Sequence, residues 1–132
     1  MVASDEEGVR NANAAFYVAF EARDVHQMAT VWEHSSRVFC IHPGWPALIG
    51  WDNVLPSWYG LFTNSERLQF LIVNEVVSLA GDCAWVVCEE NLIDQGPEAG
   101  LYAINHFICV EDGRWLMVGH VSAPIPERAV GF

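Results

Sequence analysis

Residues 101–122 read LYAINHFICVEDGRWLMVGHVS, and two apolar runs flank the pair Asp112-Gly113 in this stretch. An Asp-Gly pair between apolar runs is typical of a tight turn that joins two antiparallel strands. Two more apolar runs precede this hairpin, at 68–79 and 83–93, with turn residues between the runs. The second half of the chain is therefore predicted to be a meander of four long strands.

The hairpin also predicts which side chains lie together. A two-residue turn pairs Glu111 with Arg114, and counting back along both strands places Asn105 opposite His120. These two would share one face of the sheet with Phe107 and Val118. If the turn instead carries a glycine bulge, the register slips by one residue and His106 replaces Asn105 as the neighbour of His120.

The first half of the chain predicts three helices and one short strand. A capping box at Ser4 to Glu7 opens a helix that ends near Arg23. The apolar face of this helix is Val9, Ala12, Phe16, Ala19 and Phe20. A second helix follows Asp24, a strand covers 37–42, and a third helix is capped by Asp52 with a kink at Pro56, or begins at Pro56.

This order of elements is that of an α+β fold. Helices followed by a strand meander predict a curved antiparallel sheet that wraps its helices. The chain has 132 residues and no linker or repeat, so we expect a single domain over 1–132. The later strands are apolar on both faces, and one face is expected to meet a second copy of the chain as a homodimer.

Charge and composition exclude several classes of function. The chain has six arginines, no lysine and seventeen acidic residues, for a net charge of −11. This charge argues against nucleic acid and anionic membrane surfaces as partners. The absence of lysine excludes Schiff-base catalysis, pyridoxal-phosphate attachment and a P-loop. With no signal peptide, no long apolar run and four cysteines in no CxxC spacing, the sequence predicts a cytoplasmic protein with reduced thiols.

Residues 39–50, FCIHPGWPALIG, end a strand with His42 and continue directly into a turn. Prolines on both sides of Trp45 stiffen this segment, so an indole held there would lose little entropy on covering an apolar ligand. The alternative is that Trp45 closes the core at the mouth of the fold. In both cases the segment is expected to cross the mouth of a cavity.

Several motifs together resemble a known family. They are HPGWP at 42–46, Gly50, the strand DCAWVVC at 82–88, and DGRW at 112–115 followed by His120 and Ser122-Ala-Pro124. In this order they resemble the SnoaL-like branch of the nuclear transport factor 2-like superfamily, which includes ketosteroid isomerase. The resemblance spans nearly the whole chain and implies a cone-shaped, cystatin-like α+β barrel, with a pocket between helices and sheet and a homodimer.

The Asp or Asp-Arg-Asp set that enzymes of this superfamily mostly place in the pocket has no counterpart inside the predicted strands here. The remaining catalytic candidates are His42, His120 and Glu90. Glu89 and Glu90 point to opposite faces, and related domains that place a pocket side chain at this point of the strand favour Glu90. A carboxyl buried among apolar neighbours has a pKa raised toward neutrality, as a general acid or base needs.

The expected ligand contacts are Trp45, Trp58, Asn105 and Phe107. His42, His106 and His120 could converge, but no paired histidine spacing exists, so neither a metal nor a cofactor is expected. One hypothesis is an acid/base isomerase, hydratase or cyclase acting on a small apolar or aromatic compound. The alternative is a module that binds a ligand or associates as a dimer without catalysis.

Overall fold

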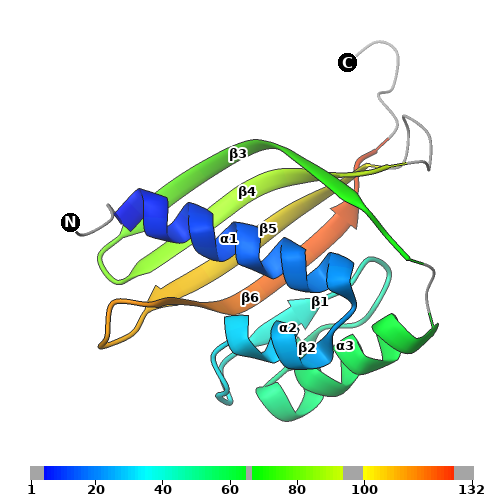
Figure 1. Ribbon diagram of the computed structural model, residues 1–132, viewed down its shortest axis with the longest axis horizontal. Helices are drawn as coiled ribbons and strands as arrows, with labels where there is room; N and C mark the ends of the chain where they lie inside the picture. The colour runs from blue at the N-terminus through cyan, green and yellow to red at the C-terminus, as the bar shows by residue number, and fades with distance from the viewer. Residues whose placement is uncertain (1–4, 65–66, 94–99, 127–132) are drawn as a thin grey trace.

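The computed structural model describes residues 5–64, 67–93 and 100–126 and confirms the α+β architecture (Figure 1). Three helices, α1 (Asp5–Ala22), α2 (Val25–Val31) and α3 (Trp51–Asn64), accompany one sheet of six strands. The strands are β1 (Phe39–Ile41), β2 (Leu48–Ile49), β3 (Phe70–Ala80), β4 (Cys83–Leu92), β5 (Gly100–Cys109) and β6 (Trp115–Pro124). Their order across the sheet is β2-β1-β6-β5-β4-β3.

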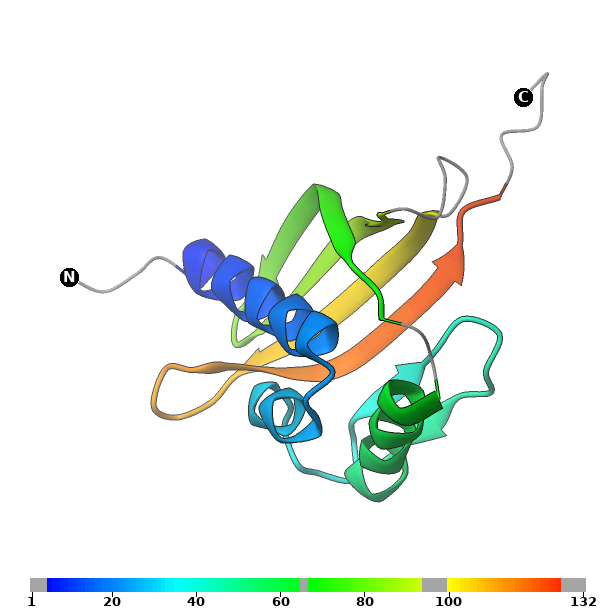
Figure 2. The ribbon, with the colours of Figure 1, turned by 45° about the vertical axis from the view of Figure 1, so that its right-hand side comes forward.

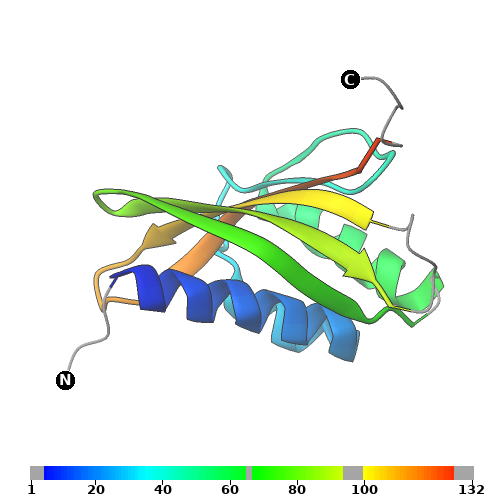
Figure 3. The same ribbon diagram turned by 90° about the horizontal axis from the view of Figure 1, so that it is seen from above.

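The helices form one layer of the fold. In Figure 1, α1 runs across the face of β3 to β6. Figure 2 shows α3 beside the β1-β2 hairpin, while α2 packs against α1 and α3. Seen from above in Figure 3, α1 lies against one face of β3 and β4, and none of the three described helices covers the other face of these two strands. We call the face toward α1 the concave face and the other the outer face.

Local sequence explains most helix boundaries. The Asp24 side chain accepts hydrogen bonds from the backbone amides of His26 and Gln27, which confirms the predicted cap of α2. Both predicted starts of α3, after a cap at Asp52 or at Pro56, were wrong. The helix begins at Trp51, the amides of Asn53 and Val54 donate to the carbonyl of Gly50, and the helix continues through Pro56. The predicted first cap, Ser4, lies outside the described residues, as does the turn at Gly96-Pro97.

The sheet departs from the prediction at its β1 edge. β1 pairs antiparallel with β2, which the sequence did not reveal, and parallel with β6. The expectation of a purely antiparallel sheet was therefore wrong for β1 and β6, which run parallel. The segment after His42 is the loop of a small hairpin, in which the Trp45 amide donates to the His42 carbonyl at 2.9 Å.

Two β-bulges set the direction of the side chains in the sheet. In β3, Asn74 and Glu75 together oppose a single residue of β4, and Asn74 has a positive φ of 56°. In β6, Val118 is the extra residue between the pairs Phe107 with Met117 and His106 with Gly119. Because side chains alternate along a strand, each bulge moves the residues that follow it to the opposite face.

The bulge at Val118 explains why the predicted pairing of Asn105 with His120 is confirmed although the predicted turn was wrong. The turn is one residue longer than expected, with Gly113 at φ 87° and Cys109 paired with Trp115. This glycine turn shifts the register, and the bulge shifts it back, so that Asn105 again lies opposite His120. Met117, and not Val118, therefore lies opposite Phe107.

Gly119 is required for the packing of β1 against β6. It pairs with Phe39, and a Cβ added at Gly119 would collide with the Phe39 ring. That ring also contacts His106 on the outer face, at 5.5 Å between centroids. The absence of a side chain at residue 119 thus lets an aromatic ring cover the junction of the two strands.

We predict that Gly119→Ala destabilises the fold by about 1–3 kcal/mol, because the Phe39 ring must move from its packed position. Denaturant unfolding measures the change. Phe39→Ala in the same chain should remove most of this cost, since the collision is then gone. Gly60→Ala is the matched control, because a Cβ at Gly60 meets nothing within 4 Å and a helical alanine is favoured over glycine. Additive effects of Gly119→Ala and Phe39→Ala would contradict the collision.

Candidate functional site

A network of buried polar side chains lies between α1 and the concave face. His120 Nδ1 bonds to Asn105 Oδ1 at 2.6 Å, and Asn105 Nδ2 donates to the hydroxyl of Tyr17 at 3.0 Å. The Tyr17 hydroxyl donates to Glu90 Oε2 at 2.6 Å. These four side chains are buried, and three adjacent strands and α1 supply them. The network connects two of the three predicted catalytic residues.

Asn13 joins a second carboxyl group to this network. Asn105 Nδ2 also donates to Asn13 Oδ1 at 2.8 Å, and Asn13 Nδ2 donates to Glu75 Oε2 at 3.1 Å. Glu75 reaches Asn13 because of the bulge in β3. His120 likewise faces α1 because of the bulge in β6, without which the shifted register would place it opposite Ile104.

The network fixes the tautomer of His120. When Tyr17 donates its only hydroxyl proton to Glu90, its oxygen must accept from an amide nitrogen, so Asn105 turns Nδ2 toward Tyr17 and Oδ1 toward His120. Nδ1 of His120 then carries the proton. Nε2 has no hydrogen-bond partner among the described residues, and it keeps a lone pair that can accept a proton or a hydrogen bond.

Burial shifts the acidity of these groups in opposite directions. It raises the pKa of Glu90 to about 7, although the Tyr17 hydrogen bond opposes this change. It lowers the pKa of His120 to about 3, with a further lowering from His42. The pKa of Tyr17 is raised by burial and by the neighbouring Glu90. At neutral pH the site therefore combines a neutral imidazole with a carboxyl group that can exchange a proton.

His42, the third predicted catalytic residue, is buried at the end of β1 but is not hydrogen-bonded to this network. Its ring lies 6.5 Å from that of His120, and its Nε2 bonds to the Ser57 hydroxyl at 2.9 Å. Ser57 donates its proton to the carbonyl of Val54, so it is not activated as a nucleophile by His42. Burial lowers the pKa of His42 to about 4, and the ring is neutral.

Aromatic side chains occupy the space around the histidines. Trp58, an expected ligand contact, is fully buried and packs edge-to-face on His42 at 4.7 Å and on Phe20 at 5.0 Å. Its Nε1 is buried and has no hydrogen-bond partner among the described residues. An unpaired buried N–H costs about 1–3 kcal/mol, so Trp58 offers a donor that a ligand oxygen could satisfy.

The other expected contacts differ in exposure. Phe107 is buried on the concave face beside Asn105, whereas Trp45 is 41% exposed with its ring 5.0 Å from that of His42. His106 points to the outer face, toward Phe39, so it cannot meet His42 and His120 as the sequence had left open. No group of three metal-binding side chains occurs within residues 5–64, 67–93 and 100–126.

Asn13 and Tyr17 were missed by the sequence analysis, and Glu75, although a polar residue inside a predicted strand, was not assigned to the site. Asn13 and Tyr17 are one helical turn apart and lie on the buried face of α1 together with Val9 and Phe16. Their spacing from Val9 was the available signal, because positions i, i+4 and i+8 share one face of a helix. Glu75 gave no such signal. Regular alternation from the start of β3 would place it on the outer face, and nothing in the sequence indicates the bulge.

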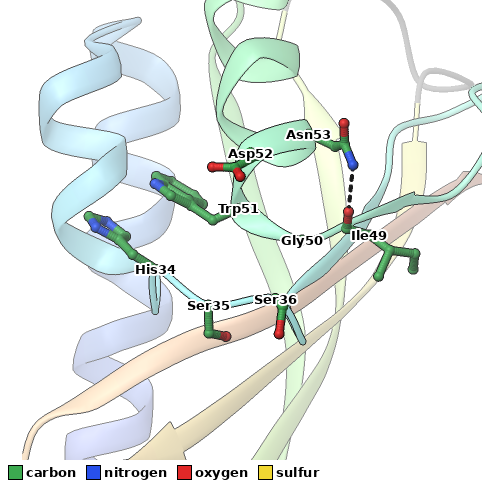
Figure 4. Close-up of a pocket in the computed structure, with 8 residues that line it drawn as sticks. All are labelled: His34, Ser35, Ser36, Ile49, Gly50, Trp51, Asp52 and Asn53. Atoms are coloured by element: carbon green, nitrogen blue, oxygen red, sulfur yellow. Dashed lines mark hydrogen bonds between the residues drawn. The ribbon is translucent and has the colours of Figure 1, made fainter.

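A separate pocket of about 400 Å³ opens at the start of α3 (Figure 4). It is lined by residues 34–36 and 49–53, and in it His34 stacks on Trp51 at 4.4 Å. Asn53 donates to the carbonyl of Ile49 at its rim. None of the predicted site residues lines this pocket, so it is distinct from the polar network.

Fold and site together define a small α+β protein with a buried acid/base network beneath its first helix. Residues 9–126 match the model of the SnoaL-like domain, and the chain belongs to this family. The predicted resemblance to the SnoaL-like branch is thereby confirmed. In the described residues, no helix is both long and apolar enough to cross a membrane.

Two solved structures are similar to this chain over most of its length. An NTF2-like family protein from Streptomyces avermitilis with a provisional dehydratase assignment is 33% identical, with a TM-score of 0.83 over 92% of this chain and 97% of that one. A provisionally assigned calcium/calmodulin-dependent protein kinase type II association domain from Thiobacillus denitrificans is 30% identical, with a TM-score of 0.79 over 86% of this chain and 92% of that one.

A curated relative is the F-box protein SKIP8 of Arabidopsis thaliana, 29% identical over 114 residues. The match covers 86% of this chain and 48% of the plant protein. The chain thus spans about half the length of this relative.

We predict that Glu90→Gln stabilises the fold more at pH 8 than at pH 5, by about 2 kcal/mol. The folded pKa of about 7 lies above the value in the unfolded chain, so the folded state binds more protons and loses stability as the pH rises through this window. Glutamine keeps an acceptor for Tyr17 without the charge. Denaturant unfolding at both pH values measures the difference.

Glu89→Gln is the matched control, because it removes the neighbouring charge on the opposite face of the same strand. A gain in folding stability at pH 8 that Glu89→Gln shares with Glu90→Gln would be an effect of net charge. If the gain of Glu90→Gln were equal at pH 5 and pH 8, the raised pKa of Glu90 would be contradicted.

Proposed function

We propose that the chain is an enzyme that moves a proton at a carbon next to a carbonyl group in a small apolar or aromatic compound. Isomerisation, hydration or dehydration, and cyclisation all include such a step. The observation that carries the proposal is the hydrogen-bonded chain from His120 through Asn105 and Tyr17 to Glu90. The similarity to the provisionally assigned dehydratase supports it.

Each group has a role that follows from its protonation state. Glu90, with a pKa of about 7, accepts the proton from the carbon and returns it to the product. Tyr17 holds the carboxylate in place through its hydroxyl. The unpaired Nε1–H of Trp58 donates to the carbonyl oxygen, on which negative charge develops as the proton leaves. Nε2 of neutral His120 accepts a hydrogen bond from a substrate hydroxyl.

The surroundings select the class of substrate. Phe16 and Trp58 are fully buried aromatic side chains that pack on His120, and they favour an uncharged compound. The net charge of −11 opposes anionic compounds. Trp45, exposed beside His42, is placed to cover the ligand.

We predict that the protein catalyses exchange of hydrogen for deuterium at the carbon next to the carbonyl of cyclohexanone or acetophenone in D2O. Glu90→Gln should lower the rate by about 100-fold or more, because it removes the base. Mass spectrometry of the ketone measures the incorporation. Glu89→Gln should leave the rate unchanged, since that side chain lies on the other face of β4.

Absence of exchange by the wild-type chain with either ketone would count against the enzyme and favour the second proposal below. Equal rates for the wild type and Glu90→Gln would exclude Glu90 as the base.

The second proposal is a dimeric association module, which is favoured by the outer face of the sheet. Leu71, Val76, Val87, Tyr102 and Ile104 on this face are between 39% and 60% exposed. Val76, Val87 and Ile104 lie side by side across β3, β4 and β5, and an exposed apolar row of this kind is typical of a protein interface. The 30% identity to the provisionally assigned association domain agrees with this. A homodimer through the outer face is compatible with either function.

We expect the chain to be a dimer by light scattering coupled to size exclusion, and Ile104→Glu to make it a monomer by placing a charge in the interface. Val18→Glu is the matched control, because Val18 is an equally apolar exposed residue on α1, away from the sheet. A monomeric wild type, or a dimer that survives Ile104→Glu, would contradict this interface.

Cytoplasmic location is a further part of the proposal. All four cysteines are free thiols in the structure. Reduced cysteines are typical of the cytoplasm, whereas disulfides persist in oxidising compartments.

A further inference from the structure

Glu75 lies outside the acid/base steps proposed above, yet it is the outermost member of the same network. It is half-buried in β3, and the bulge at Asn74 turns it toward α1. A bulge interrupts the ladder of hydrogen bonds of a sheet, and bulges often re-aim a side chain at a functional site. Here the re-aimed side chain accepts a hydrogen bond from Asn13, at 3.1 Å.

The donors and acceptors of the hydrogen bonds that join Glu75 to His120 are fixed along the whole path. A carboxylate can only accept hydrogen bonds, so Asn13 must turn its Nδ2 toward Glu75 and its Oδ1 toward Asn105. Asn105 in turn must present Nδ2 to Asn13, which leaves its Oδ1 for His120. Each amide thus transmits the orientation set by the one before it.

We infer that Glu75 is a positioning residue that sets the tautomer of His120 through Asn13 and Asn105. It holds the proton of His120 on Nδ1 and keeps Nε2 free for the substrate, although it touches neither His120 nor the reacting atoms. The importance of this role for catalysis rests on the proposed function. The tautomer itself does not, because it can be observed without any substrate.

Glu90 gives Asn105 the same orientation from the other side. By accepting from Tyr17 it makes the Tyr17 oxygen an acceptor for Asn105 Nδ2. The two effects are separated in a Glu90→Gln chain, because the glutamine amide can either donate to or accept from Tyr17. In that chain Glu75 alone determines the direction of the amides.

The test is long-range 1H–15N NMR of the His120 ring in the Glu90→Gln chain, with its signals identified by their loss in His120→Gln. With Glu75 present, the spectrum should show a single tautomer with the proton on Nδ1. Adding Glu75→Gln should give a mixture of the two tautomers, seen as convergence of the Nδ1 and Nε2 shifts. Glu111→Gln, an exposed acidic residue at the β5-β6 turn, is the matched control and should change neither shift.

Asn13→Ala interrupts the same path and should also give the mixture, which keeps the test available if Glu75→Gln does not fold. A single Nδ1-protonated tautomer that persists in both variants would overturn the inference, as would a mixture before Glu75 is changed. A tautomer that depends on Glu75 in a protein without ketone exchange would refute the proposed function and leave this inference intact.

Discussion

Two β-bulges decide which side chains face α1, and the polar network depends on both. A sheet strand alternates its side chains strictly, so one inserted residue sends every later side chain to the other face. The bulge at Asn74 and Glu75 brings a carboxyl group toward Asn13. The bulge at Val118 turns His120 toward Asn105. With regular strands, both titratable groups would point to the outer face.

The first helix makes these groups into one unit. Asn13 and Tyr17 lie on the same side of α1 as Val9 and Phe16, so the packing that buries the apolar residues also places an amide and a hydroxyl against the strands. Burial of polar groups is costly unless they are hydrogen-bonded, and here each bonds to a partner on the sheet. Burial still disfavours the charged forms, so it raises the pKa of Glu90 and lowers the pKa of His120. The same desolvation therefore gives the site its acid/base character.

Local patterns predicted much of this arrangement. The apolar runs predicted the ends of β3, β4, β5 and β6 to within two residues, and Asp24 predicted the start of α2. The assignment of Glu90 to the concave face and the pairing of Asn105 with His120 are confirmed. That pairing was predicted from a turn of the wrong length, and the error at Gly113 was cancelled by the bulge at Val118. Neither of these two deviations follows from alternation of apolar residues alone, because both depend on how the strands pack.

Local patterns are enough to predict the order of elements, the family resemblance and the set of polar residues available for chemistry, because periodicity and turn residues act over a few neighbours. Which of these residues meet depends on the packed fold. Tyr17 and Glu90 are 73 positions apart, and Asn13 and Glu75 are 62 apart. Contacts at such separations are set by the angle of α1 across the sheet and by the bulges that turn the strands, so they emerge only when the whole core is packed.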